Sequence, residues 1–305
     1  MFPYVRLNQD TREDHNMKIG LIGFNIGPAS GPDAIEVAQQ AEAVGVESMW
    51  TFEHVMIPLD YQSKYPYTAD GKMGVPPETN MVDPLIGLAA VAAATRTIRL
   101  GTGVNILPQI NPLLLAKQAA SLDFISSGRF MLGVGIGWLE EEFDAMGVPF
   151  NARGRRHDDY IEAMRKVWSG DVVEHESEHI SWHGFKSYPV PVQDPFPIVI
   201  GGSKGKAFER IAKYAQGWYA PTANIDQLQQ EMGLLADACA AIGRDPGEIE
   251  VSTMWIPSAE PDNAQAYADI GVGRLIVPQA ALAGMGASPV EQVKRFGDEV
   301  MNRFT

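Results

Sequence analysis

Residues 98–138 contain two short apolar runs, at 98–104 and 129–134, on either side of a segment with helical periodicity. Asn111 is a good N-cap for this helix, and Gly128 stands where the helix should stop. A strand, a helix and a second strand of these lengths fold as a right-handed βαβ unit whose strands are parallel. A chain that contains this unit is expected to form an α/β fold, in which helices pack against a parallel sheet.

The same alternation of strand and helix continues along the chain. Eight segments with the composition of buried strands begin near Lys18, Ser48, Ile98, Arg129, Phe196, Gly217, Glu248 and Arg274. Helical patterns lie between them, so the sequence predicts a single (β/α)8 TIM barrel with insertions. A doubly wound open sheet, which is built from the same units, is the alternative. In both folds ligands bind at the carboxyl ends of the strands, where four glycines stand: Gly101, Gly103, Gly135 and Gly137.

Three parts of the chain lie outside this alternation. Residues 1–16 are polar and lack the apolar core of a signal peptide, so we interpret them as an N-terminal extension that precedes a barrel domain at 17–305. Residues 55–82 are irregular and rich in proline, tyrosine and glycine, and so long a connection in a compact domain is typical of a lid over a site. Residues 170–195 contain strand-like alternation and are predicted to form a hairpin insertion.

Composition and charge narrow the classes of partner. The net charge of −14 and the pI near 4.8 disfavour a nucleic-acid-binding surface. No run approaches the roughly 18 apolar residues of a membrane-spanning helix, so we expect no membrane partner and a cytoplasmic location. Cys239 is the single cysteine, which excludes an internal disulfide and a thiolate metal cluster, and its spacing is that of a buried helix face.

Two strand ends carry residues that are candidates for chemistry. Glu53 and His54 directly follow the second strand and should face the mouth of the barrel. An imidazole there can accept or donate a proton near neutral pH, although a single histidine can also be structural. After the third strand, Thr102-Gly103-Val104-Asn105 contains a glycine that either lets the backbone approach a flat ligand or serves a tight bend.

The turn Gly201-Gly202-Ser203-Lys204 lies between a predicted strand and a predicted helix. Its backbone N–H groups, the helix dipole and the Ser203 hydroxyl would form a site for a phosphate. Lys204, Lys206 and Arg210 supply positive charge in an otherwise acidic chain. The alternative interpretation is a tight turn with solvated lysines.

Other motifs give weaker or negative signals. The Rossmann glycine pattern, the GxxxxGK[ST] loop and the nucleophile elbow are all missing. Three histidines recur at every fourth residue: His175, His179 and His183. On a helix they would suggest zinc, but the surrounding residues alternate as strands do, so no metal site is expected. An amphipathic helix is predicted for residues 158–168, and three arginines precede it: Arg153, Arg155 and Arg156. These arginines form either a solvated face or a clamp for the substrate.

Several motifs also carry a family resemblance over residues 17–280. They are Asn111-Pro112-Leu113-Leu114-Leu115-Ala116-Lys117-Gln118, Ser121-Leu122-Asp123, Ser127-Gly128-Arg129, Gly133-Val134-Gly135-Ile136-Gly137-Trp138, Pro197-Ile198-Val199-Ile200-Gly201-Gly202 and Gly217-Trp218. Together they resemble the luciferase-like monooxygenase superfamily. Within it, Trp50-Thr51-Phe52-Glu53-His54 with Pro58 resembles the branch that uses the deazaflavin coenzyme F-420 rather than FMN.

The resemblance implies a bacterial luciferase-like barrel that holds a flavin-like ring at its mouth. It implies that Thr102-Gly103-Val104-Asn105 supports the ring, with a non-prolyl cis peptide bond between Gly103 and Val104. The cleft beside the ring would be lined by Gly135, Gly137 and Trp138, and the phosphate would be bound by Gly201, Gly202, Ser203 and Lys204.

The same resemblance places His54 beside the ring and the reacting substrate as proton donor or acceptor. Glu53, which stands where the family usually has an aspartate, would orient or charge that histidine. The resemblance thus predicts an oxidoreductase that transfers a hydride between F-420 and a small organic substrate.

Two alternatives remain open at this point. The first is an FMN-dependent monooxygenase that receives reduced flavin from a partner reductase and activates oxygen. The second is a barrel that binds the flavin or deazaflavin without turning it over. A homodimer is a further expectation, because members of the family often form pairs.

Overall fold

Nine parallel strands form one closed barrel in the computed structural model, which describes residues 17–28, 30–257 and 263–303. The strands are β1 (Lys18–Ile22), β2 (Ser48–Thr51), β3 (Arg99–Thr102), β4 (Asn105–Ile106), β5 (Phe130–Gly135), β8 (Ile198–Gly201), β9 (Gly217–Ala220), β10 (Glu250–Met254) and β11 (Arg274–Pro278). Because β3 pairs with both β2 and β5, the sheet closes on itself. β3 and β4 occupy one position, so the predicted (β/α)8 barrel is confirmed and the open sheet is excluded.

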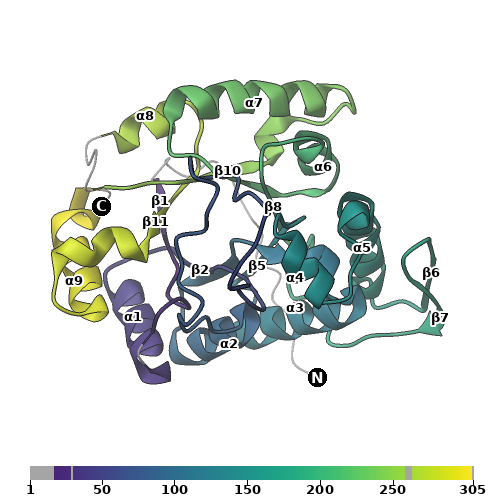
Figure 1. The fold of residues 1–305 in the computed structure, drawn as a ribbon, viewed down its shortest axis with the longest axis horizontal. Helices are drawn as coiled ribbons and strands as arrows, with labels where there is room; N and C mark the ends of the chain where they lie inside the picture. Colours follow the sequence, from purple (N-terminus) through teal and green to yellow (C-terminus); the bar gives the residue numbers. More distant parts are fainter. Residues whose placement is uncertain (1–16, 29, 258–262, 304–305) are drawn as a thin grey trace, which may run out of the picture.

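Helices surround the strands on all sides when the barrel is viewed along its axis (Figure 1). They are α1 (Gly31–Ala43), α2 (Pro84–Ala94), α3 (Pro112–Ser126), α4 (Glu140–Ala145), α5 (Arg153–Trp168), α6 (Ala207–Tyr214), α7 (Ile225–Ala240), α8 (Ala264–Asp269) and α9 (Pro289–Glu299). Polar side chains cap several of them as the sequence predicts. Asn111 accepts hydrogen bonds from the N–H groups of Leu113 and Leu114, which no helical carbonyl can satisfy.

Helix α5 is longer than predicted. The sequence pattern indicated a start at Asp158, but the helix begins at Arg153. The Arg153 guanidinium lies 3.7 Å from the centre of the Phe150 ring, and Arg156 donates a hydrogen bond to the Tyr160 hydroxyl one turn later. These contacts stabilise a polar first turn that carries no apolar periodicity, which explains why periodicity alone missed it.

The interior of the barrel is filled by a small cluster of its own. The cluster consists of the buried side chains of Ile22, Trp50, Met131, Val199, Tyr219 and Ile276. A Cβ atom on Gly101 would lie only 2.4 Å from the Trp50 ring, so glycine at this position makes room for the indole. Gly101 therefore serves the core, whereas the sequence pattern had placed it at the ligand edge.

The amino end of the barrel carries a buried charge network. Arg274 is 1% exposed, and its guanidinium lies 2.9 Å from a carboxylate oxygen of Glu47 and 2.6 Å from one of Glu250. Burial alone would raise the pKa of both acids, but Arg274 outweighs burial and holds the pKa values below the ordinary range. The guanidinium also lies over the Trp50 ring, with 5.6 Å to its centroid.

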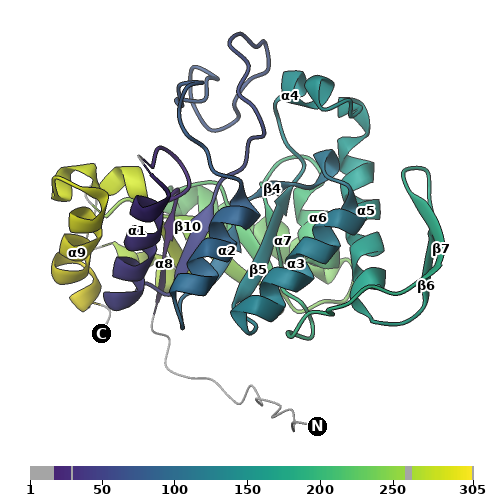
Figure 2. The same ribbon diagram turned by 90° about the horizontal axis from the view of Figure 1, so that it is seen from below.

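Two insertions decorate the barrel. Residues 55–82 contain no helix or strand apart from an isolated bridge and rise above the carboxyl ends of the strands, with α4 standing beside them (Figure 2). We call these residues the lid. Strands β6 (Val173–Glu176) and β7 (Ser181–Phe185) form an antiparallel hairpin at the side of the barrel. The predicted N-terminal extension, residues 1–16, lies outside the described residues.

Candidate active site

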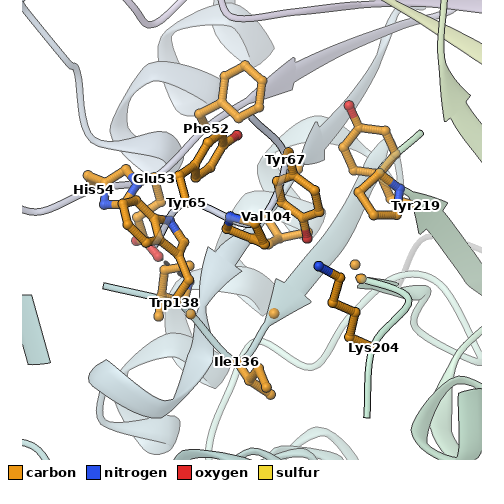
Figure 3. Close-up of a pocket in the computed structure, with 18 of the residues that line it drawn as sticks. Phe52, Glu53, His54, Tyr65, Tyr67, Val104, Ile136, Trp138, Lys204 and Tyr219 are labelled. Atoms are coloured by element: carbon orange, nitrogen blue, oxygen red, sulfur yellow. Dashed lines mark hydrogen bonds between the residues drawn. The ribbon is translucent and has the colours of Figure 1, made fainter. Parts of the chain in front are cut away.

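The lid and the carboxyl ends of the strands enclose a cavity of about 500 Å³. Its lid wall is formed by Lys64, Tyr65, Pro66, Tyr67, Met73, Val75 and Met81. Figure 3 shows Glu53, His54 and Trp138 grouped on one side, Lys204 and Tyr219 on the other, and Val104 with Tyr67 between them. We call the first group the His54 end and the turn at 201–204 with its neighbours the Lys204 end.

Glu53 lies in an environment that favours its neutral form. The residue is 9% exposed, and its carboxyl group accepts hydrogen bonds from the Asn105 side-chain amide (2.6 Å) and from the Ile106 backbone N–H. Burial raises its pKa to about 7, although the two hydrogen bonds act to lower it. The negative charges of Asp83 and Glu142 contribute a smaller increase. A carboxyl group that titrates near neutrality inside a cavity is suited to acid or base chemistry.

The partner of His54 is Glu142 rather than Glu53. Nδ1 of His54 lies 3.0 Å from a carboxylate oxygen of Glu142 on α4, whereas both oxygens of Glu53 are turned toward β4. The prediction that Glu53 orients His54 is therefore wrong. The side chains of consecutive residues after β2 diverge, and the acid that reaches the imidazole comes from a helix 88 positions later in the chain.

Aromatic rings enclose the His54 end. The Trp138 ring contacts His54 edge-on, with 5.9 Å between centroids, and meets Tyr61 and Tyr65 of the lid at 5.7 and 5.1 Å. Tyr65 in turn contacts Tyr67 at 5.3 Å. Trp138 thus joins the barrel to the lid and forms an apolar wall beside the imidazole.

The floor of the cavity is the interruption of the third strand. The peptide bond between Gly103 and Val104 is cis, as the resemblance implied. Gly103 and Val104 line the cavity, and the Val104 side chain is accommodated by two glycines, since a Cβ on Gly135 or Gly201 would lie 2.7 or 2.8 Å from it. This arrangement leaves a flat apolar surface at the centre of the cavity.

Thr102 and Asn105, by contrast, do not line the cavity. The Thr102 hydroxyl donates to the Gly133 carbonyl (2.7 Å) and accepts from the Gly133 N–H (2.9 Å), which ties β3 to β5 just before the cis bond. Asn105 is 1% exposed and directs its amide to Glu53. Both side chains support the floor from behind.

The Lys204 end contains the turn that was predicted to bind a phosphate. Gly201, Gly202, Ser203 and Lys204 line it, and Gly202 has a φ of +107° with open space where a Cβ would project. Arg210, on α6 directly after this turn, and Arg153 also line the cavity, and Arg210 forms an ion pair with Asp158 at 2.5 Å. Among the described residues that line the cavity are four lysines and arginines but one carboxylate, Glu53.

Two further polar groups at this end were missed by sequence reasoning. His157 is fully buried in α5 and lines the cavity, and burial lowers its pKa against the opposing effect of Asp158. The Tyr219 hydroxyl is buried without a hydrogen-bond partner in the described structure, and burial raises its pKa. A buried hydroxyl without a partner is costly, so this group is suited to contact a ligand.

Several other candidate residues lie away from the cavity. His175 pairs with Asp159 at 2.7 Å and stacks on Trp182, while His183 is exposed on the hairpin. Within the described residues there is no group of three metal-binding side chains that could hold an ion. Cys239 is buried in α7, as predicted. None of the helices in the described ranges is both long and apolar enough to cross a membrane.

Comparison with known proteins agrees with this architecture. The sequence model of the family described as luciferase-like monooxygenase matches residues 18–300. An uncharacterised protein of Mycobacterium tuberculosis is 32% identical over 261 residues, which cover 85% of this chain and 91% of that protein.

Two curated relatives carry functional names. An F420-dependent hydroxymycolic acid dehydrogenase of Mycobacterium tuberculosis is 30% identical over 213 residues, 68% of this chain and 54% of that protein. The oxygenase component of a flavin-dependent trigonelline monooxygenase of Acinetobacter baylyi is 30% identical over 169 residues, 55% of this chain and 41% of that protein.

A solved structure supports the fold. The F420-dependent secondary alcohol dehydrogenase in complex with an F420-acetone adduct superposes with a TM-score of 0.73 at 15% identity. The match covers 92% of this chain and 97% of that one. This F420-dependent protein and the present chain therefore share the barrel fold.

Proposed function

The chain belongs to the luciferase-like monooxygenase family, and from this premise we propose that it is an oxidoreductase that transfers a hydride between the deazaflavin coenzyme F-420 and a small organic substrate. The observation that carries the proposal is that the two ends of the cavity hold different kinds of polar side chain. One end holds the ionisable side chains of Glu53 and His54 and the other holds Lys204, and the basic side chains of Arg153 and Arg210 also line the cavity. The name of the dehydrogenase relative favours F-420 as the coenzyme.

The residues of the cavity fit a flat anionic coenzyme. Val104 and Gly103 would lie against the ring, and the N–H groups of the turn at 201–204 with Lys204 would hold a phosphate. The unpartnered Tyr219 hydroxyl would gain a hydrogen bond from a polar atom of the ligand. When bound, the deazaflavin supplies a carbon that accepts or returns a hydride.

The chain itself would provide positioning and proton transfer. His54 would exchange a proton with the substrate oxygen, because it borders the cavity at the end opposite Lys204. Glu53 would hold a proton reversibly near pH 7 behind the same end. Trp138, Tyr65 and Tyr67 would exclude water from the reacting groups.

An FMN-dependent monooxygenase is the second candidate, because the flavin-dependent trigonelline monooxygenase matches the chain at the same identity. In that case a reductase partner would supply reduced flavin. The same floor and the same phosphate site would serve FMN.

Equilibrium titration of the purified protein with oxidised F-420 and with FMN separates the two. We expect micromolar affinity for F-420 and affinity at least about tenfold lower for FMN, a difference of about 1.4 kcal/mol. Tighter binding of FMN than of F-420 would overturn the proposed coenzyme.

Replacement of His54 by alanine tests the catalytic assignment. We expect H54A to bind the coenzyme normally but to turn over substrate about 100-fold more slowly, as is usual when a general acid or base is removed. Unchanged turnover would reject His54 as a catalytic residue, and an absence of turnover in the wild type across alcohols and ketones would favour a barrel that only binds the coenzyme.

A further inference from the structure

Glu142 joins two parts of the site that are far apart in the sequence. One carboxylate oxygen accepts hydrogen bonds from the backbone N–H groups of Val55 (2.7 Å) and Met56 (3.3 Å), the first residues of the lid. The other oxygen lies 3.0 Å from Nδ1 of His54 and accepts a longer hydrogen bond, of 3.4 Å, from the side-chain amide of Gln109. The side chain is 2% exposed, so these contacts replace the water that a carboxylate would otherwise bind.

The charge state of Glu142 decides what His54 can do. Burial would raise the pKa of this carboxyl group, but the contacts with His54 and the lid backbone outweigh burial and lower it. An ionised carboxylate can only accept hydrogen bonds, so Nδ1 of His54 must carry a hydrogen. In the neutral imidazole, Nε2 is then the nitrogen with a free lone pair.

We propose that Glu142 is a positioning residue that fixes the Nδ1–H tautomer of His54 and fastens the start of the lid with the same carboxylate. The inference rests on the proposed function only for its effect on turnover, since the tautomer is a property of the protein without ligand. Lid attachment and imidazole orientation are thereby linked, because one group serves both.

Substitution of Glu142 by glutamine tests the proposal with little change of shape. The amide oxygen of the variant can still accept from Val55 and Met56, which directs the amide NH2 group toward His54. The Gln109 amide, which donates to this position in the wild type, can turn over so that its unpartnered Oε1 accepts from the new NH2 group. Nδ1 must then accept a hydrogen bond, so the neutral ring moves its hydrogen to Nε2. E142Q therefore reverses the tautomer while it preserves the lid contact.

Glu141 provides a matched control on the same helix. It also fastens the lid, through the N–H groups of Gln62 (2.6 Å) and Ser63 (3.2 Å), and it has no contact with His54. E141Q removes the same charge, one residue away, and leaves the partner of the imidazole in place.

The measurement is nitrogen-15 NMR of the histidine rings in the ligand-free protein, with the His54 signals assigned by their loss in H54A. We expect the Nδ1–H tautomer in the wild type and in E141Q, and the Nε2–H tautomer in E142Q. An Nε2–H tautomer in the wild type overturns the proposal even if E142Q fails to fold, and so does an unchanged His54 tautomer in E142Q.

Turnover with the coenzyme that the titration identifies adds a second readout. We expect E142Q to lose about 100-fold in kcat, the usual contribution of a correctly placed acid or base. The loss in E141Q should be less than about tenfold, because its effect is confined to the lid. Equal losses of kcat in the two variants would mean that Glu142 affects turnover only through its contact with the lid. Failure of the coenzyme assignment would leave the NMR result standing, so the two proposals can fail separately.

Discussion

Both ends of the barrel contain ionisable side chains with little exposure, but Glu53 at the carboxyl end differs from the acids at the amino end in its partners. At the amino end the buried guanidinium of Arg274 meets the half-buried carboxylates of Glu47 and Glu250, so each of these charges has a charged partner. At the carboxyl end Glu53 is held by an amide and a backbone N–H, which are neutral donors. The pKa of the amino-end acids is lowered, and that of Glu53 is raised to about 7.

The difference shows how one fold separates stability from chemistry. Acids that pair with a buried guanidinium stay ionised near neutral pH, whereas a buried acid without a charged partner can change its protonation there. The comparison predicts that substitutions at the amino end change the free energy of unfolding and that substitutions at the carboxyl end change binding, turnover and pH response.

The largest effect is expected from the replacement of Arg274 by methionine. R274M leaves the carboxylates of Glu47 and Glu250 without their buried partner, so we expect a loss of about 3–5 kcal/mol of unfolding free energy. Urea denaturation measures it. As a control, Lys18 pairs with the same Glu250 but is 45% exposed, so K18M should cost no more than about 1 kcal/mol. Similar losses of unfolding free energy in both variants would mean that the ion pairs of Arg274 contribute no more to stability than the exposed pair of Lys18.

The replacement of Glu53 by glutamine should change the pH dependence of stability. An acid whose pKa rises from 4.5 to about 7 on folding is ionised first in the unfolded chain. The wild type should therefore lose up to about 3 kcal/mol as pH rises through this window, at about 1.4 kcal/mol per pKa unit. E53Q lacks this loss, and its amide can donate to the unpartnered Oδ1 of Asn105.

Denaturation of wild type and E53Q at several pH values between 4 and 8 checks this expectation. The free energy of E53Q relative to the wild type should rise with pH and level off above about pH 7. Parallel curves would mean that Glu53 is ionised in the folded protein across the range, as the amino-end acids are.

The replacement of Lys204 by alanine should weaken coenzyme binding without a change in stability. The side chain is exposed at the edge of the cavity, so the unfolding free energy should stay within about 0.5 kcal/mol of the wild type. Loss of a charge-assisted contact should raise the Kd of F-420 about tenfold. The deazaflavin riboside, which lacks the phosphate, is the matched probe, and its Kd should not change. An equal effect on both ligands would contradict a phosphate site at this turn.

The smallest effect is expected from the replacement of Tyr219 by phenylalanine. The ring stays packed against Trp50, at 6.1 Å between centroids, and only the unpartnered hydroxyl is lost. We expect the Kd of the coenzyme to rise about fivefold, near 1 kcal/mol, and stability to be unchanged or higher. Calorimetric titration measures the affinity, and an unchanged Kd would show that the hydroxyl has no ligand partner.

The fold was predictable because its signals are local. Asp83, Asn111 and Ser288 each stand directly before a proline that begins a helix, and all three cap their helices in the structure. Strand ends, too, could be placed from apolar runs, and with them the residues Glu53, His54 and Lys204 at the mouth of the barrel.

The pairings within the site were not predictable in the same way. Glu142 stands in an acidic first turn that reads as a solvated helix start, and only the closed barrel brings it to His54. His157 lies in a stretch whose apolar periodicity begins later. Thr102 and Asn105 were predicted from strand position, but position does not tell whether a side chain turns toward the cavity or back to the sheet.

The way in which the lid is fastened bears on how the sequence of the lid can vary. The carboxylates of Glu141 and Glu142 bind the lid through main-chain N–H groups at Val55, Met56, Gln62 and Ser63. Every amino acid except proline has such a group, so these hydrogen bonds do not depend on which side chains the lid carries at the four positions. The lid side chains that line the cavity, from Lys64 to Met81, follow these anchors in the chain. Libraries that randomise them while sparing α4 would change the wall of the cavity and leave the attachment of the lid unaltered.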